Sequence, residues 1–348
     1  MKKRVVTIIG ARPQFIKAST LSREIKNHDV FEEIVIHTGQ HFDKNMSDIF
    51  FDELKISKPK YIFDIHSCSH GKMTGQMLIA IEEVFLNEKP DLVLVYGDTN
   101  STLAGAIAAS KLNIPLAHVE AGLRSFNRKM PEEINRLLTD HLSKFLFCPT
   151  KQALKNLKIE GITNGVYYTG DIMYDATIFA KDYINKNFKK FNNKFKIRKN
   201  EYGLMTIHRQ ESVNNKIKFS NLFDYADKFS QKNNIKILFP VHPRTKALIK
   251  EYELKSNFSF LDPLSYFEIQ YLISNAFVVL TDSGGLQKEA YFHKVPCVTF
   301  RSETEWVETI ENGWNRLWTE NHYKSRQKIF DYGDGNGAKD IINILLES

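Results

Sequence analysis

The segment from residue 118 to residue 136, HVEAGLRSFNRKMPEEINR, combines carboxylates, an imidazole and arginines over a short distance. Carboxylates and imidazoles are common general acids and bases, and nearby arginines bias their ionisation. Glu120 follows an apolar run, and Glu132 follows Pro131 at a predicted helix start. Asp98 also follows an apolar run, in VYGDT. These carboxylates indicate proton-transfer chemistry.

Each of these carboxylates also has a structural explanation. Asp98 could cap the helix expected from residue 101, although Thr99 or Asn100 could equally fill that role. Glu132 could be an ordinary first-turn acid, because the helix macrodipole favours negative charge there. For a single carboxylate the structural explanation is the simpler one. Three strand-end carboxylates in one half of the chain, with a nucleotide-type motif in the other half, favour a function.

That motif is TDSGGLQKEA, residues 281–290, which suits an anionic ligand. Ser283, Gly284 and Gly285 lie between an apolar run and a predicted helix. Glycines let the backbone approach a ligand, and a helix N-terminus presents unpaired N–H groups, so the motif suits a diphosphate. Glu289, one turn into the helix, is placed to accept hydrogen bonds from a ribose. The alternative is an ordinary turn with Ser283 as N-cap.

A similar turn, GARPQFIK, occupies residues 10–17. Gly10 suits a tight turn, and Pro13 suits the first turn of a helix. Arg12 and Lys17 could reach an anionic ligand from there. The alternative is a capped turn whose cations are solvated.

His208 follows another apolar run, beside Arg209 and Glu211, and a structural and a functional role are equally open for it. His242 in VHPR is a similar but weaker case. The sequence has no G-x-G-x-x-G after a predicted strand, no P-loop motif, no H-E-x-x-H and no Cys/His cluster. We therefore expect neither a metal nor a dinucleotide cofactor.

The elements that must position these residues are short apolar runs that alternate with helical stretches. Continuous apolar runs are typical of parallel strands covered on both faces. They predict an α/β fold of two doubly wound domains, the first at 1–172, joined by the C-terminal helix 336–348, and the second at 173–335. In such sheets ligands bind beyond the carboxyl ends of the strands, where the candidate residues stand. The runs are RVVTIIG, EIVIHTG, DLVLVYGDT, PLAHVEAG, KFLFCPT and GVYYTGD, then YGLMTIHRQ, IKILFPVHPR, FSFLD, FVVLTDSGG and PCVTFRSET.

The composition agrees with two cytoplasmic domains. A chain of 348 residues, 42% hydrophobic, is too long for one typical core, and its apolar runs are too short to span a membrane. Three widely spaced cysteines predict no disulfide framework and a reducing compartment. The net charge of +7 equals that of residues 181–200 alone. A basic patch for nucleic acid is the alternative, but a solvated surface segment is the simpler interpretation.

Taken in order, the motifs resemble the non-hydrolysing UDP-N-acetylglucosamine 2-epimerase family over essentially the whole chain. They are GARPQFIK, HTGQHFD, YGDTNST, HVEAGLRS, PEEINR, HRQES, TDSGGLQKEA and YGDG. The resemblance implies the GT-B architecture, in which two Rossmann-like domains face each other across a cleft and hold the nucleotide-sugar. It also implies a UDP-sugar substrate, no cofactor and a homodimer.

The resemblance also implies roles for single residues. Those that match positions holding the UDP part are Arg12, Lys17, His208, Ser283, Gly284, Gly285 and Glu289. Asp98, Glu120 and Glu132 match the catalytic carboxylates, and Arg136 matches an arginine of the same site; we count His208 with the catalytic residues. The implied reaction eliminates UDP across carbons 1 and 2 to give a 2-acetamidoglucal. UDP then re-adds, with a proton delivered to the opposite face of carbon 2.

One departure concerns the sugar. Residues 304–308 read TEWVE, with Trp306 where enzymes acting on UDP-N-acetylglucosamine typically carry arginine. This version is more similar to the branch acting on UDP-2,3-diacetamido-2,3-dideoxy-glucuronate, whose manno product is used in surface polysaccharides such as lipopolysaccharide. We expect that substrate, with UDP-N-acetylglucosamine as the alternative.

Three other functions are compatible with parts of the pattern. A GT-B glycosyltransferase would share the UDP site but needs an acceptor and usually a single base. A hydrolysing epimerase would release free sugar and UDP. A nucleotide-sugar sensor is suggested by Gln40 and His41 in HTGQHFD, a segment that resembles the regulatory site of some family members. A sensor alone would not need Asp98, Glu120 and Glu132 together.

Overall fold

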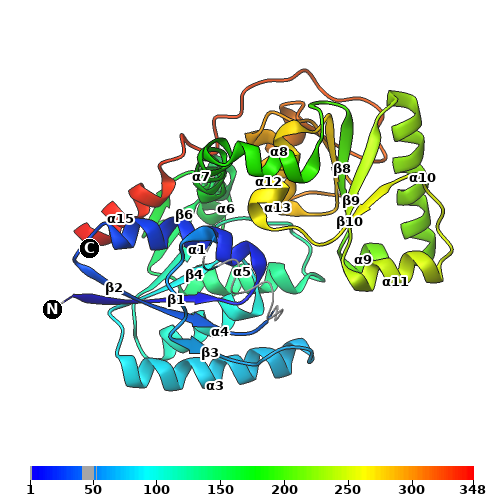
Figure 1. The fold of residues 1–348 in the computed structure, drawn as a ribbon. Coiled ribbons are helices and arrows are strands. Elements are labelled where there is room, and N and C mark those ends of the chain that lie inside the picture. Colours follow the sequence, from blue (N-terminus) through cyan, green and yellow to red (C-terminus); the bar gives the residue numbers. More distant parts are fainter. Residues whose placement is uncertain (1, 41–50, 52) are drawn as a thin grey trace. The chain divides into compact units, whose positions relative to one another are not determined.

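The computed structural model describes residues 2–40, 51 and 53–348. The chain divides into two units, one formed by residues 1–176 and 330–348 and the other by residues 177–329. Helix α7 (Ile172–Lys186) continues from the first unit into the second. Each unit is built around its own parallel sheet (Figure 1).

The first unit contains a seven-stranded sheet in the order β3-β2-β1-β4-β5-β6-β7, counted over the described residues. All of its strand pairs are parallel. Its elements are β1 Lys3–Ile9, α1 Arg12–Lys26, β2 Phe31–His37, β3 Tyr61–Ile62, α3 His70–Glu88, β4 Leu92–Tyr96, α4 Asn100–Lys111, β5 Leu116–Val119, α5 Pro131–Leu142, β6 Phe145–Cys148, α6 Lys151–Ile159, β7 Val166–Tyr168 and α15 Gly337–Glu347.

Helices cover both faces of this sheet, which is why its central strands are apolar throughout. Helices α3 and α4 pack together on one face, and α1 lies beside α15 on the other (Figure 1). Strand β4 reads LVLVY, and all of its residues are buried. A strand buried on both faces shows no alternation between polar and apolar residues.

The second unit contains a six-stranded parallel sheet in the order β10-β9-β8-β11-β12-β13. Its elements are α8 Phe188–Phe195, β8 Tyr202–Thr206, α9 Gln210–Val213, α10 Lys216–Asn233, β9 Lys236–Pro240, α11 Pro243–Glu251, β10 Ser259–Leu261, α12 Tyr266–Asn275, β11 Val278–Thr281, α13 Gly284–Phe292, β12 Cys297–Thr299, α14 Val307–Glu311 and β13 Asn315–Leu317.

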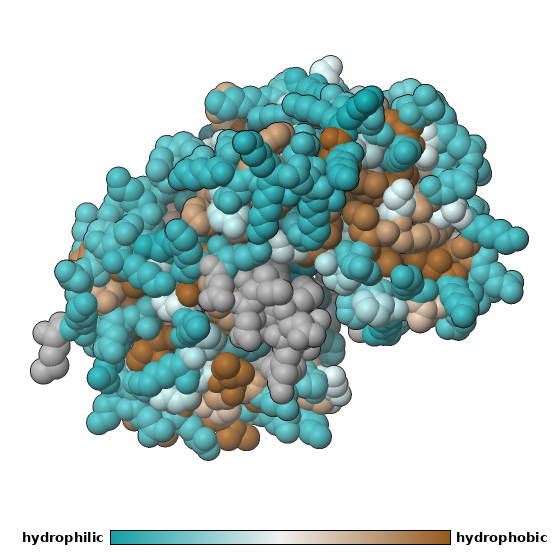
Figure 2. All heavy atoms as spheres, in the orientation of Figure 1, coloured by the Kyte–Doolittle hydropathy of each residue, from teal (hydrophilic) through white to brown (hydrophobic). Residues whose placement is uncertain are grey.

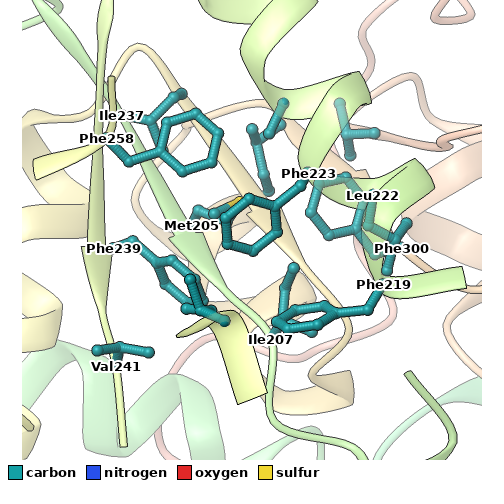
Figure 3. Close-up of a cluster of buried hydrophobic side chains, with 14 of the residues drawn as sticks. Met205, Ile207, Phe219, Leu222, Phe223, Ile237, Phe239, Val241, Phe258 and Phe300 are labelled. Carbon is teal, nitrogen blue, oxygen red and sulfur yellow. The ribbon is translucent and has the colours of Figure 1, made fainter. Parts of the chain in front are cut away.

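Aromatic side chains of α10 form much of the core against this second sheet (Figure 3). Phe219 and Phe223 are four residues apart and therefore share one helix face. Their rings meet edge to face with centroids 5.0 Å apart, and Phe223 meets Phe239 of β9 at 6.0 Å. Met205 of β8 lies in the same cluster. This packing fixes α10 on the sheet.

Both sheets have a point at which the strand order reverses. In the first sheet it lies between β1 and β4, and in the second between β8 and β11. The predicted fold class, two doubly wound α/β domains, is therefore confirmed. Ligands of open α/β sheets bind at the carboxyl ends of the strands on either side of such a point.

The surface drawn in Figure 2 is largely hydrophilic, with hydrophobic residues scattered over it. Within the described ranges, no helix is both long and apolar enough to cross a membrane.

Candidate active site

The turn after β1 is tied to the end of β4, across the reversal point of the first sheet. Gln14 of α1 accepts hydrogen bonds from the backbone N–H groups of Gly10 (2.8 Å) and Ala11 (3.0 Å). Its amide donates to the carbonyl oxygen of Tyr96 at 2.8 Å. A Cβ on Gly10 would lie 2.1 Å from the hydroxyl oxygen of Thr38, so only glycine fits. The turn therefore starts α1 at a fixed place beside β4.

Helix α1 brings Lys17 to this edge of the sheet. Its ammonium forms an ion pair with the carboxylate of Glu120, and both side chains are 9% exposed. Burial alone would lower the pKa of Lys17, but Glu120 and, more weakly, Asp98 raise it above its ordinary value. The lysine is therefore a cation held beside two predicted catalytic carboxylates. Arg12, the first residue of α1, is half-buried.

Glu120 adopts a backbone conformation that is unusual for a residue with a side chain. Its φ is +78°, in the left-handed region. Its N–H donates to the carbonyl oxygen of Phe147 on β6 at 3.1 Å, and that of Ala121 donates to the same oxygen at 3.0 Å. Such strain persists only where the surroundings enforce it, and it concentrates at functional sites.

Asp98 follows β4 and is held by helix α5. Arg136 donates to Asp98 Oδ2 from Nε (3.0 Å) and from Nη2 (2.8 Å). The amide of Asn135 donates to the carbonyl oxygen of Asp98 at 2.8 Å. Thr99 is the N-cap of α4, accepting a hydrogen bond from the N–H of Thr102. The carboxylate of Asp98 is therefore not used as the helix cap and faces Arg136 instead.

Glu132 and Glu133 share the first turn of α5 but differ in their surroundings. Glu133 is buried; it accepts from the N–H and hydroxyl of Ser125 (2.8 and 2.9 Å) and from Arg136 Nη1 (2.6 Å). Burial would raise the pKa of Glu133, but these hydrogen bonds and Arg136 lower it. Glu132 is exposed. The structure thus gives Glu133 an anchoring position and leaves Glu132 facing solvent.

At the reversal point of the second sheet, Asp282 organises the turn after β8. Its buried carboxylate accepts from the N–H groups of His208 (3.1 Å) and Arg209 (2.9 Å). Asp282 Oδ1 also lies 3.2 Å from Nδ1 of the His208 ring, which is 59% exposed. Burial alone would raise the pKa of Asp282, but His208 and the two N–H groups lower it. The His208 ring is therefore fixed at a strand end with one face open.

Helix α13 follows β11, as the sequence predicts, but it begins at Gly284, so both glycines of the motif lie in its first turn and not before it. Ser283 is its N-cap, and its hydroxyl makes no capping hydrogen bond. A Cβ on Gly284 would lie 2.5 Å from Glu305 Oε1, whereas one on Gly285 would meet only Ser283 Oγ, at 4.0 Å. Gly285 therefore faces open space at the helix N-terminus. Glu289 is buried one turn further along α13.

Trp306 is buried beside the same helix. The ammonium of Lys288, also buried, lies over its ring at 3.6 Å from the centroid, a close cation–π contact. The indole Nε1 is 3.4 Å from the position of a Cβ on Gly284. Glu305, its neighbour, accepts from Arg301 Nη1 at 2.8 Å. The segment that departs from the family pattern thus lines the start of α13.

The structure brings together Lys17, Glu120, Asp98 and Arg136 in the first unit. It also places His208 and the start of α13 at one edge of the second sheet. The sequence alone assigned no anchoring role to Gln14, Glu133 or Asp282. For Glu133 a signal existed, because it stands three residues before Arg136, on the same face of a helix.

Two further expectations concern regulation and metals. The segment HTGQHFD continues beyond Gln40 into residues that lie outside the described ranges, so the suggested sensing role of His41 stays a prediction. Among the residues that the structure describes, no group of three or more His, Cys, Asp or Glu side chains could hold a metal ion.

This chain is similar to known proteins over nearly its whole length. The family model described as UDP-N-acetylglucosamine 2-epimerase matches residues 23–346. A UDP-N-acetylglucosamine 2-epimerase homolog of Methanococcus maripaludis is 52% identical, over 98% of this chain and 99% of its own. The UDP-2,3-diacetamido-2,3-dideoxy-D-glucuronate 2-epimerase of Pseudomonas aeruginosa is 49% identical, over 90% of this chain and 88% of its own. The crystal structure of Methanocaldococcus jannaschii UDP-GlcNAc 2-epimerase in complex with UDP-GlcNAc and UDP matches with a TM-score of 0.89, 42% identity and complete coverage of both chains.

Proposed function

Because this chain belongs to the UDP-N-acetylglucosamine 2-epimerase family and is thus an isomerase, we propose that it inverts carbon 2 of a UDP-2-acetamido sugar. The proposed route is elimination of UDP followed by its re-addition. The observation that carries it is the pairing of two strand-end carboxylates with cations, Glu120 with Lys17 and Asp98 with Arg136.

The route follows from the chemistry of the sugar. Carbon 2 bears an acetamido group and has no neighbouring carbonyl, so direct loss of its proton would leave an unstabilised carbanion. If a base takes that proton while the bond from carbon 1 to the UDP oxygen breaks, the electron pair forms a carbon 1–carbon 2 double bond. In the return step the UDP oxygen attacks carbon 1, and an acid protonates the opposite face of carbon 2.

This route needs acid and base groups on both faces of carbon 2. We assign these roles to Asp98, Glu120 and Glu132. Positioned acids and bases contribute about 10²–10⁴-fold each. Ion pairs with the cations Lys17 and Arg136 hold Glu120 and Asp98 in place at the strand ends.

The departing UDP must be stabilised and retained until it re-adds. We assign this to the start of α13, where Ser283, Gly284 and Gly285 present a helix N-terminus, and to His208. A helix N-terminus favours negative charge that develops on a diphosphate. Arg12 and Lys17 are assigned to the same ligand as cations, and Glu289 to its ribose.

For the sugar, we propose UDP-2,3-diacetamido-2,3-dideoxy-glucuronate, converted to its manno epimer. The support is Trp306 in TEWVE, together with 49% identity to the Pseudomonas aeruginosa enzyme named for that substrate. Lys288 beneath the Trp306 ring gives a physical reason why an aromatic side chain is stable at this position. UDP-N-acetylglucosamine is the second candidate, supported by 42% identity to the Methanocaldococcus jannaschii enzyme.

The test is to incubate the purified protein with each UDP-sugar separately, without any acceptor, and to follow the products by NMR. We expect the manno epimer to form, faster from the diacetamido-glucuronate than from UDP-N-acetylglucosamine. Conversion only in the presence of an acceptor would indicate a glycosyltransferase. Accumulation of free sugar and UDP would indicate a hydrolase. Faster conversion of UDP-N-acetylglucosamine would overturn the proposed substrate but not the proposed epimerase activity.

A further inference from the structure

A buried cluster of charged groups is hydrogen-bonded to residues next to Asp98 and near Glu120. His118 of β5 is fully buried, with Nδ1 2.6 Å from Asp140 Oδ1 and Nε2 2.8 Å from the carbonyl oxygen of Gly97. Asp140 lies on α5, and its second oxygen accepts from the N–H of Gly122 (3.1 Å) and from Arg124 Nη1 (2.7 Å). The proposed chemistry assigns no role to His118 or Asp140.

The partners of His118 fix the orientation of its ring. One ring nitrogen is hydrogen-bonded to the carboxyl group of Asp140 and the other to the carbonyl oxygen of Gly97, so the ring bridges α5 and the end of β4. Burial alone would raise the pKa of Asp140, but His118 and Arg124 hold it below its ordinary value.

Arg124 joins the cluster to a second carboxylate. It forms two parallel hydrogen bonds to Glu160, Nε to Oε1 at 2.7 Å and Nη2 to Oε2 at 2.6 Å. The guanidinium of Arg124 is therefore paired with both Asp140 and Glu160, as expected where buried charges must be paired.

The hydrogen bonds of this cluster reach the backbone directly before Asp98 and the residues on both sides of Glu120. Gly97, whose carbonyl accepts from His118, directly precedes Asp98 and has a left-handed φ of 62°. His118 and Gly122 stand two residues before and after Glu120, and both are bonded to Asp140. The strained backbone of Glu120 is therefore held at both flanks by one carboxylate.

We propose that His118 and Asp140 are positioning residues for the epimerase reaction, fixing Asp98 and Glu120 relative to one another. This inference rests on the proposed function, which assigns those two carboxylates to carbon 2. Both side chains are 0% exposed, so they act through the backbone that they hold. Charge-assisted hydrogen bonds are stronger and shorter than neutral ones, which suits a fixed spacing.

Kinetics test the positioning role. His118→Asn and Asp140→Asn should lower kcat by about 10²-fold, as expected for misplaced catalytic groups, and leave the affinity for UDP within about threefold. His293→Asn, the matched control in the second unit, should keep wild-type turnover. Wild-type kcat in a folded His118→Asn enzyme would contradict the proposal, whereas absence of epimerisation by the wild-type enzyme would contradict the proposed function itself.

Discussion

Glu132 and Glu133 are adjacent in sequence, carry the same chemical group and start the same helix, yet the structure separates their tasks. Glu133 is buried and anchors both Arg136 and the N–H of Ser125. Glu132 is exposed, so it is accessible to a ligand. The pair therefore allows a comparison in which the helix, the charge and the substitution are the same.

Glu132→Gln should affect turnover, whereas Glu133→Gln should affect stability. Glu133→Gln should lower the free energy of unfolding by roughly 1–3 kcal/mol, because it weakens charged hydrogen bonds to buried donors. Glu132→Gln should leave stability nearly unchanged but lower kcat by about 10²–10⁴-fold, because it removes a proton carrier. Denaturant unfolding and steady-state assays of the two variants measure both effects. Wild-type kcat in Glu132→Gln would show that Glu132 is an ordinary first-turn acid without a catalytic role.

At this scale the sequence indicates the candidate carboxylates more readily than the residues that anchor them. Asp98 and Glu120 could be singled out because each follows a buried strand, and the structure joins them to cations. Asp282 could not be assigned as an anchor for the His208 turn, because the two are far apart in the chain and are paired only when β8 and β11 lie side by side.

At the scale of elements, the start of α13 presents two adjacent glycines with different constraints. Gly284 faces the carboxylate of Glu305, so a methyl group there would displace the end of that side chain. Gly285 faces open space, so the fold itself does not require glycine there. A requirement for glycine at position 285 would therefore come from the ligand.

Gly285→Ala should fold with wild-type stability and bind UDP at least about tenfold more weakly, because its methyl group occupies the approach of the diphosphate to the helix N-terminus. Calorimetric titration with UDP measures the affinity, and thermal unfolding without UDP measures the stability. In Gly284→Ala, the comparison, the methyl group should in addition displace the Glu305 carboxylate. Unchanged UDP affinity in Gly285→Ala would show that the diphosphate does not bind at the N-terminus of this helix.

Helix α15 is fastened to the first unit by a buried carboxylate. Asp175 Oδ1 accepts from the N–H of Ala338 in the first turn of α15 at 2.9 Å. Burial raises the pKa of Asp175 to about 6, above the value of about 3.9 expected in the unfolded chain. A raised pKa in the folded state means that this group favours folding at low pH, and that its contribution is lost as the pH rises through about 6.

Asp175→Asn should therefore change how stability depends on pH. Asparagine still accepts the hydrogen bond but cannot ionise. Between about pH 5 and about pH 7.5, the wild-type protein should lose about 1.4 kcal/mol more stability than the variant. Denaturant unfolding at both pH values measures the difference. Parallel pH profiles would show that Asp175 has an ordinary pKa in the folded protein.

Most strands of both sheets could be predicted from the sequence, because central strands buried on both faces are continuous apolar runs. The strands β3 (Tyr61–Ile62) and β13 (Asn315–Leu317) could not, since two or three residues at a sheet edge carry no such run. Their existence depends on pairing with β2 and β12. Tertiary context decides such short strands.

At the scale of the whole molecule, one proposed reaction is divided between residues distant in sequence. Proton transfer is assigned to residues between Asp98 and Glu132, and retention of UDP mainly to residues from His208 to Glu289. The epimer forms only when UDP adds again to the glucal, so UDP must be retained while carbon 2 is planar, and both tasks must be performed together. The expected homodimer stays a prediction.

The most direct test of this account is epimerisation in deuterium oxide, followed by NMR and mass spectrometry of the product. A carboxylate that takes the proton from one face of carbon 2 cannot return it to the other, so the epimer should carry one deuterium at carbon 2. The glucal and UDP should appear transiently. An epimer formed without deuterium at carbon 2 would contradict elimination and re-addition, and would require a route in which the original hydrogen is carried across.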